Sequence, residues 1–205
     1  MLPADETGSS PNPDTPRLLI VVASTRPGRV GLPVSRWVRE QAEQHGGFTV
    51  EVADLAEIDL PFMDEPNHPR LRQYTKQHTK EWSAIVDAAD AFVFVMPEYN
   101  HAFTAPLKNA IDYLVQEWGY KPVGLVSYGG VSGGLRAVQL LKPTLSGLRM
   151  IPLTEGVPIP GVSSLIGDDG EFQATDQLDD SARGMFNALA RWVPALHPLR
   201  APASS

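Results

Sequence analysis

The sequence predicts an α/β fold in which helices cover both faces of a five-stranded parallel sheet with the strand order 2-1-3-4-5. Two observations indicate this fold. Five apolar segments alternate with segments of helical periodicity, and three of these strands run directly into polar or glycine-rich turns. In the simplest doubly wound order, the first, third and fourth strands lie side by side, so that their turns converge at one edge. The expected strands are 17–23, 48–54, 91–96, 121–127 and 149–153.

The expected helices carry apolar residues at intervals of three and four, which is typical of helices packed on a sheet. They cover residues 33–45, 74–89, 105–115, 135–146 and a last helix that begins at Asp176. Prolines interrupt residues 55–71 and 155–175, which we expect to be irregular. We expect a single domain from residue 17 to 196, with a disordered tail at 1–16 and a loose tail at 197–205.

Composition excludes several classes of function. The chain has 205 residues, a net charge of −7 and a pI of about 5.2, which does not favour nucleic acid or an anionic membrane as a partner. It has no cysteine, so that redox work would need a bound cofactor. Its histidines lack metal-ligand spacing, and we expect no metal site. Asp5 and Glu6 stand where a signal peptide would be basic, which predicts a cytoplasmic protein.

The turn after the first strand combines hydroxyl groups with guanidinium groups, in the residues Ser24, Thr25, Arg26 and Arg29. A helix N-terminus follows directly, and its amides and dipole favour an anion. The turn lacks the sequence patterns of a triphosphate loop or a dinucleotide fingerprint, so that a monophosphate is favoured. The alternative is that both arginines are ordinary surface charges and that Ser24 caps the helix.

Three motifs follow the three strands: STRPGRVG, then PEYN with APLKNAIDYL, and YGGVSGGLRAVQLLKPTL. Together they resemble the NADPH-dependent FMN reductase family, which has a flavodoxin-like fold and includes azo-dye, quinone and chromate reductases. The resemblance covers about residues 17–153. The chain departs from it mildly, because Ala23 stands where many members have glycine and Ala102 where many have serine.

The resemblance implies FMN as cofactor and NADPH or NADH as reductant. It implies that the first turn holds the FMN phosphate and that the other two turns hold the isoalloxazine, through Pro97, Glu98, Tyr99, Asn100, Ser127, Gly129, Gly130 and Ser132. Glu98 could equally be a structural hydrogen-bonding residue in its turn. His101 is a candidate substrate contact, with shaping of the turn or the rim as the alternative. Hydride transfer through a flavin needs no protein acid, so that no catalytic residue is assigned.

The expected function is therefore hydride transfer from NAD(P)H through bound FMN to a small acceptor, by a ping-pong mechanism. The acceptor would be a quinone, an azo compound, a flavin or a metal oxyanion. A flavodoxin-like electron carrier and an inactive flavin-binding regulatory protein are the alternatives. The resemblance also implies a homodimer or a homotetramer.

Overall fold

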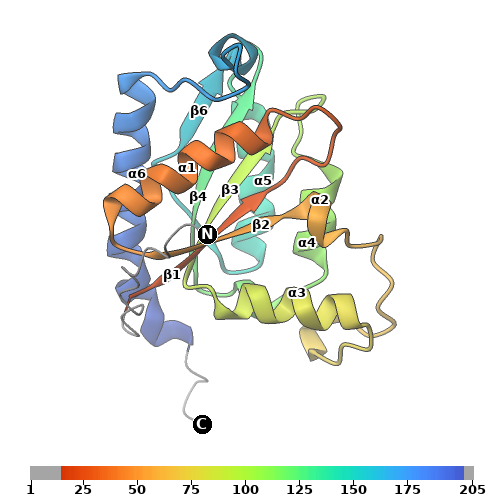
Figure 1. Cartoon of the computed structure of the whole chain (residues 1–205). Coiled ribbons are helices and arrows are strands. Elements are labelled where there is room, and N and C mark those ends of the chain that lie inside the picture. The colour runs from red at the N-terminus through yellow and green to blue at the C-terminus, as the bar shows by residue number, and fades with distance from the viewer. Residues whose placement is uncertain (1–14, 201–205) are drawn as a thin grey trace, which may run out of the picture.

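A computed structural model describes residues 15–200 of the chain (Figure 1). The predicted disordered tail, except for its last two residues, and the last five residues of the predicted C-terminal tail lie outside the described residues. The strands are β1 Arg17–Val22, β2 Thr49–Asp54, β3 Ala91–Pro97, β4 Pro122–Gly129, β5 Ile151–Pro152 and β6 Val157–Pro160. The α-helices are α1 Gly31–His45, α2 Leu55–Ile58, α3 Gln77–Ala88, α4 Ala105–Asp112, α5 Leu135–Gly147 and α6 Asp176–Leu196.

The strands form one sheet in the order β2-β1-β3-β4-β5, and every pairing is parallel. This confirms the predicted fold class and strand order. All seven residues of β3 are buried, and so are five of the six in β1. Their unbroken apolar runs fit this position, because a central strand of a parallel sheet is covered on both faces.

A sixth strand lies in the segment that the sequence predicted to be irregular. β6 pairs with the carboxyl half of β4, while β5 pairs with its first two residues, so that the two short strands share one edge of β4. Val157 and Ile159 are fully buried, whereas Pro158 and Pro160 are not. Because Pro158 and Pro160 break the usual signal of a strand, the pattern predicted a loop. An edge strand tolerates them.

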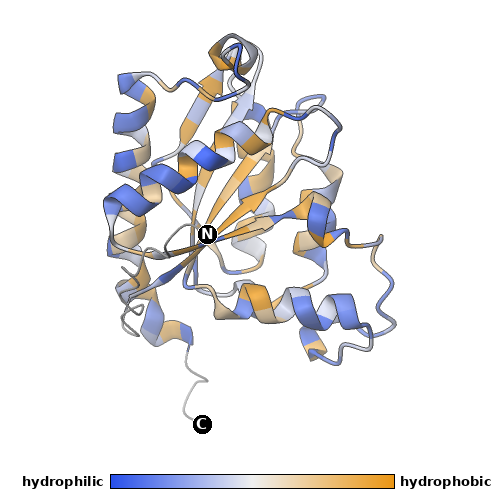
Figure 2. Ribbon diagram, in the orientation of Figure 1, coloured by the Kyte–Doolittle hydropathy of each residue, from blue (hydrophilic) through white to orange (hydrophobic). Residues whose placement is uncertain are grey.

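Two apolar layers cover the sheet (Figures 1 and 2). One core lies between the sheet and the pair α1 and α6, which pack against each other. The other core lies between the opposite face and the helices α3, α4 and α5. Figure 2 shows hydrophobic strands at the centre and hydrophilic residues on the outer sides of the helices. Both faces of the sheet are thus covered. Binding sites can form at its two ends, where the loops lie.

Two further segments differ from expectation. The proline-rich stretch 55–71 is not wholly irregular, because it contains α2 and the 3₁₀ helix η1 Pro69–Leu71. The chain from residue 197 continues as the 3₁₀ helix η4 His197–Arg200, in which Arg200 forms an ion pair of 2.7 Å with Asp90. Within residues 15–200, no helix is long and apolar enough to cross a membrane.

Candidate functional site

The three predicted turns meet at the carboxyl edge of the sheet and are tied together by hydrogen bonds. The hydroxyls of Ser24 and Tyr99 lie 3.0 Å apart, which joins the first turn to the second. The Ser132 hydroxyl donates to Glu98 over 2.9 Å, which joins the third turn to the second. Thr104 caps α4 and donates its hydroxyl to the carbonyl of Ala23 over 2.7 Å. One rim therefore carries all three turns.

Arg29 has a structural role in the first turn. Its two terminal nitrogens donate to the carboxylate of Asp54, at the end of β2, and to the carbonyl of Ser24. Both members of the Arg29–Asp54 ion pair are nearly buried. This differs from the phosphate contact expected for Arg29, because its guanidinium is occupied within the protein. Thr25 and Arg26 are exposed and form no ion pair with the described residues.

The N-terminus of α1 has unused hydrogen-bonding groups. Its N-cap residue, Val30, provides no side-chain cap for the first-turn amides. The hydroxyl of Tyr128 lies against Gly31, where an added Cβ would come within 2.6 Å of it. Tyr128 is 3% exposed, and its buried hydroxyl has no hydrogen-bond partner among the described residues. Burial raises the pKa of Tyr128 far above its ordinary value, although the nearby Ser24 hydroxyl and Arg29 oppose it, so that the hydroxyl stays a donor.

The second turn is a tight reversal after β3. Tyr99 and Ala102 exchange two backbone hydrogen bonds of 2.9 Å, and the two residues between them, Asn100 and His101, have positive φ angles of 49° and 69°. Such a turn with two left-handed residues is rigid, and for a non-glycine residue this backbone is strained. The turn holds the exposed side chains of Tyr99, Asn100 and His101 at fixed places on the rim.

Glu98 supports the third turn and α5. Its carboxylate accepts hydrogen bonds from the Ser132 hydroxyl and from both the backbone N–H and the guanidinium of Arg136, in the first turn of α5. Burial works to raise the pKa of Glu98, but these hydrogen bonds outweigh burial and hold the pKa below its ordinary value. Of the two roles considered for Glu98, the structure favours the structural one.

The third turn contains two kinds of glycine. Gly134 has a φ of 84°, and an added Cβ would lie 2.7 Å from Ser127 Cβ, so that the protein itself requires glycine there. At Gly130, by contrast, an added Cβ would meet nothing within 4 Å, and at Gly129 its nearest neighbour would be 3.5 Å away. The protein therefore leaves open space beside Gly130, whereas a side chain at Gly129 would be in ordinary contact with its neighbours. Ser127 donates its hydroxyl to Gly133 over 2.7 Å and so holds the turn.

A shallow cavity of about 530 Å³ lies beside the second turn. His101 forms one wall, and α5 forms the other with the apolar Leu135 and Leu140 and the polar Arg136 and Gln139. His101 therefore both shapes the turn and lines the rim. Its position agrees with either role that the sequence left open.

Four residues that organise this edge were not identified from the sequence: Asp54, Thr104, Tyr128 and Arg136. Asp54 ends a strand at the carboxyl edge, a position that could have drawn attention to it. Thr104 stands directly before a proline-containing helix start, which is a common pattern for an N-cap. The roles of Tyr128 and Arg136 depend on contacts between separate loops, which local patterns do not reveal.

A family model described as NADPH-dependent FMN reductase matches residues 16–163, a span that includes all three turns. The chain belongs to this family. Membership confirms the resemblance, and it confirms the predicted oxidoreductase class and the predicted cofactors, FMN and NAD(P)H. The residue roles at the rim stay predictions.

We compare this member of the NADPH-dependent FMN reductase family with two curated relatives and one solved structure. An NAD(P)H-dependent FMN reductase of Schizosaccharomyces pombe is 42% identical over 190 residues, which are 90% of this chain and 95% of that protein. An FMN-dependent NADPH-azoreductase of Staphylococcus saprophyticus is 31% identical over 171 residues, covering 82% of this chain and 84% of the relative.

The solved structure is a flavoenzyme NAD(P)H:(acceptor) oxidoreductase of Paracoccus denitrificans. It superposes with a TM-score of 0.68 at 20% identity, over 88% of this chain and 98% of that one. At this identity the likeness shows the fold alone. It agrees with the flavodoxin-like architecture predicted from the sequence.

Proposed function

We propose that this protein is an NAD(P)H-dependent reductase that holds FMN at the carboxyl edge of its sheet and reduces a small acceptor by a ping-pong mechanism. The main support is the unpartnered Tyr128 hydroxyl beside the uncapped N-terminus of α1. A buried donor without a partner costs free energy, and a phosphate oxygen at this place would satisfy it.

The phosphate end of FMN would be held by the first-turn amides of α1, the Tyr128 hydroxyl, Thr25 and Arg26. Arg26 is the exposed arginine of this turn, whereas Arg29 keeps the turn in place through Asp54. Ser24 is buried, and its hydroxyl meets that of Tyr99. Hydroxyls and amides then surround the anion, and one exposed guanidinium adds the charge.

The ring of FMN would lie over the second and third turns. The open space at Gly130 admits a flat ring, because nothing in the protein lies within 4 Å of the place where a Cβ would be. Tyr99 is 38% exposed and offers an apolar face. The side chains of Glu98, Ser127 and Ser132 are engaged within the protein. These three therefore support the loops, while the backbone of residues 97–100 faces the ring.

Bound FMN supplies the redox chemistry, namely hydride uptake from NAD(P)H and delivery of two electrons to an acceptor. The chain's own residues bind the FMN and orient it toward the reductant and the acceptor. The rigid turn at Asn100 and His101 fixes one border of the cavity, and the apolar side of α5 fixes the other. Reductant and acceptor would use this open cavity in turn, which is why we propose ping-pong kinetics and a broad choice of quinones and azo compounds.

The test is reduction of the bound flavin by each nicotinamide. FMN-saturated protein mixed anaerobically with NADPH or NADH should lose its visible flavin absorbance, and a quinone or an azo dye should restore it. Initial rates at several fixed concentrations of quinone should give parallel double-reciprocal lines. A flavin that neither nicotinamide reduces would favour an electron carrier. A protein that takes up no FMN would favour a regulatory role. Either result overturns the proposal.

The cytoplasmic location and the homodimer or homotetramer predicted from the sequence are also part of this proposal. Light scattering during gel filtration measures the number of subunits, and a monomer would contradict the second point.

A further inference from the structure

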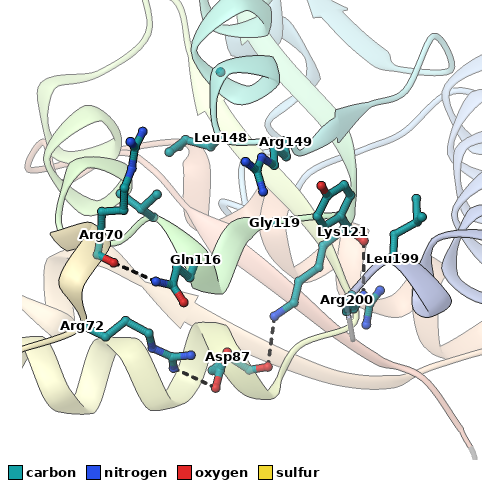
Figure 3. A pocket seen from close by; sticks show the side chains of 13 residues that line it. Arg70, Arg72, Asp87, Gln116, Gly119, Lys121, Leu148, Arg149, Leu199 and Arg200 are labelled. Atoms are coloured by element: carbon teal, nitrogen blue, oxygen red, sulfur yellow. Dashed lines mark hydrogen bonds and ion pairs between the residues drawn. The ribbon is translucent and has the colours of Figure 1, made fainter. Parts of the chain in front are cut away.

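A second cavity lies at the opposite end of the sheet (Figure 3). Its volume is about 760 Å³, which is in the range of small-molecule sites. Lys121 directly precedes β4, and Arg149 lies two residues before β5, so that both lie at the amino ends of their strands. The eight residues of β4 separate this cavity from the third turn by about 25 Å. It is therefore a separate site from the flavin edge.

Five cationic side chains line this cavity, although the whole chain has a net charge of −7. Two of them are neutralised. Arg72 pairs with Asp87 at 3.0 Å and with the buried Glu117 at 3.2 Å, and Arg200 pairs with Asp90 at 2.7 Å. The other three are Arg70, Lys121 and Arg149, and none of these forms an ion pair with any residue in the range 15–200.

Lys121 brings a buried charge to this cavity. Its ammonium group is buried and donates to the carbonyls of Val86 and Asp87 over 2.9 and 3.0 Å, which leaves its third proton without a partner among the described residues. The pKa of Lys121 is lowered to about 8, chiefly by burial and with a smaller contribution from the nearby Arg200, although Asp87 opposes them. A bound anion would relieve this shift.

The backbone holds the lining in an unusual conformation. Tyr120 and Arg149 have positive φ angles of 57° and 62°, and Tyr120 N–H donates to the carbonyl of Arg149 over 2.9 Å. The guanidinium of Arg149 lies over the Tyr120 ring at 5.7 Å. Figure 3 shows Arg70 and Arg149 projecting from different segments of the lining. Strained non-glycine residues of this kind gather at binding sites.

We propose that this cavity binds a pyrophosphate group, either free or carried by a small nucleotide. Arg70 and Arg149 would contact it directly, and Lys121 would supply the third charge from the wall. Guanidinium groups suit phosphate oxygens, because their donors form a planar fork. The half-buried Tyr120 and Leu148 and the exposed Leu199 would offer apolar contacts to an organic portion. This proposal goes beyond the reductase function and does not depend on it.

The test is calorimetric titration of the FMN-saturated full-length protein with inorganic pyrophosphate and, separately, with ADP. Both should bind, and ADP should bind more tightly only if the organic portion contributes. The double variant Arg70→Gln/Arg149→Asn should weaken pyrophosphate binding about tenfold or more, because each lost contact is a charge-assisted hydrogen bond. Asparagine suits position 149, because it tolerates a positive φ.

Arg183→Gln is the matched control, since Arg183 is an exposed residue of α6 that pairs only with Asp180 in the described chain. It should bind pyrophosphate as the unaltered protein does. Two results would overturn the proposal: no binding heat with the unaltered protein, or equal affinity in the double variant. The single variant Arg70→Gln controls for misfolding of the double variant. It should fold normally, because the Arg70 side chain is exposed and forms no hydrogen bond with residues 15–200.

Discussion

The two ends of the sheet handle charge in different ways. At the carboxyl edge the charges nearest the three turns are paired within the protein, as in Arg29 with Asp54 and Glu98 with Arg136. Amides, a tyrosine hydroxyl and the exposed Arg26 are left for a ligand. At the amino edge, three cations in the cavity lack a carboxylate partner in residues 15–200. At the carboxyl edge, paired charges hold the loops in place. At the amino edge, the unpaired charges can contact a ligand.

The largest expected effect comes from Arg29→Met. This change leaves the nearly buried Asp54 carboxylate without its ion-pair partner. Breaking such a pair should lower the free energy of unfolding by about 3 kcal/mol, measured by urea denaturation of the flavin-free protein. If Arg29 were a free phosphate ligand instead, stability would stay the same and only FMN affinity would fall.

Arg26→Met is the control in the same turn. It removes the same charge from an exposed position, and the free energy of unfolding should stay within about 0.5 kcal/mol. Affinity for FMN should fall about tenfold, while affinity for riboflavin, which lacks the phosphate, should not change. Fluorescence titration with both flavins measures this. Equal losses for both flavins would contradict a phosphate contact.

An intermediate effect of unusual sign is expected for Tyr128→Phe. Removing an unpartnered buried hydroxyl should leave the flavin-free protein as stable as before, or more stable by up to about 1 kcal/mol. The gain in melting temperature on adding FMN should become smaller, because one phosphate donor is lost. Calorimetric scans with and without FMN measure both quantities. A less stable flavin-free variant would indicate that the hydroxyl already has a partner.

The smallest effect concerns Glu98→Gln and depends on pH. The pKa of Glu98 is lowered in the folded protein, so that its charge stabilises the fold fully above the unfolded pKa of about 4.3. That contribution is lost as the pH falls through the lowered folded value. The variant should therefore be less stable at neutral pH, and the difference should shrink in acid. Melting temperatures across the pH range measure it. A constant difference would show that the carboxylate charge is not the cause.

The sequence predicted the parts of the molecule that are governed by local pattern. Continuous apolar runs located the central strands, and the position of the turns after them predicted one shared edge. Pairing between residues far apart in the sequence could not be predicted from these patterns. Asp54, the partner of Arg29, lies 25 residues away, and Arg136, a partner of Glu98, lies 38 residues away. Neither local pattern indicates which residue the partner is. The amino-end cavity was missed for the same reason, because its lining comes from several separate segments.

The prolines of β6 have a consequence for assembly. The N–H of Gly161 points toward Gly130, so that by alternation positions 158 and 160 face away from β4, and prolines there have no N–H to offer. An incoming strand from another molecule would find no donor along this stretch, which protects this edge of the sheet, though not the β2 edge, from edge-to-edge aggregation. Copies of this chain that associate on this side must therefore meet through side chains rather than by extending the sheet.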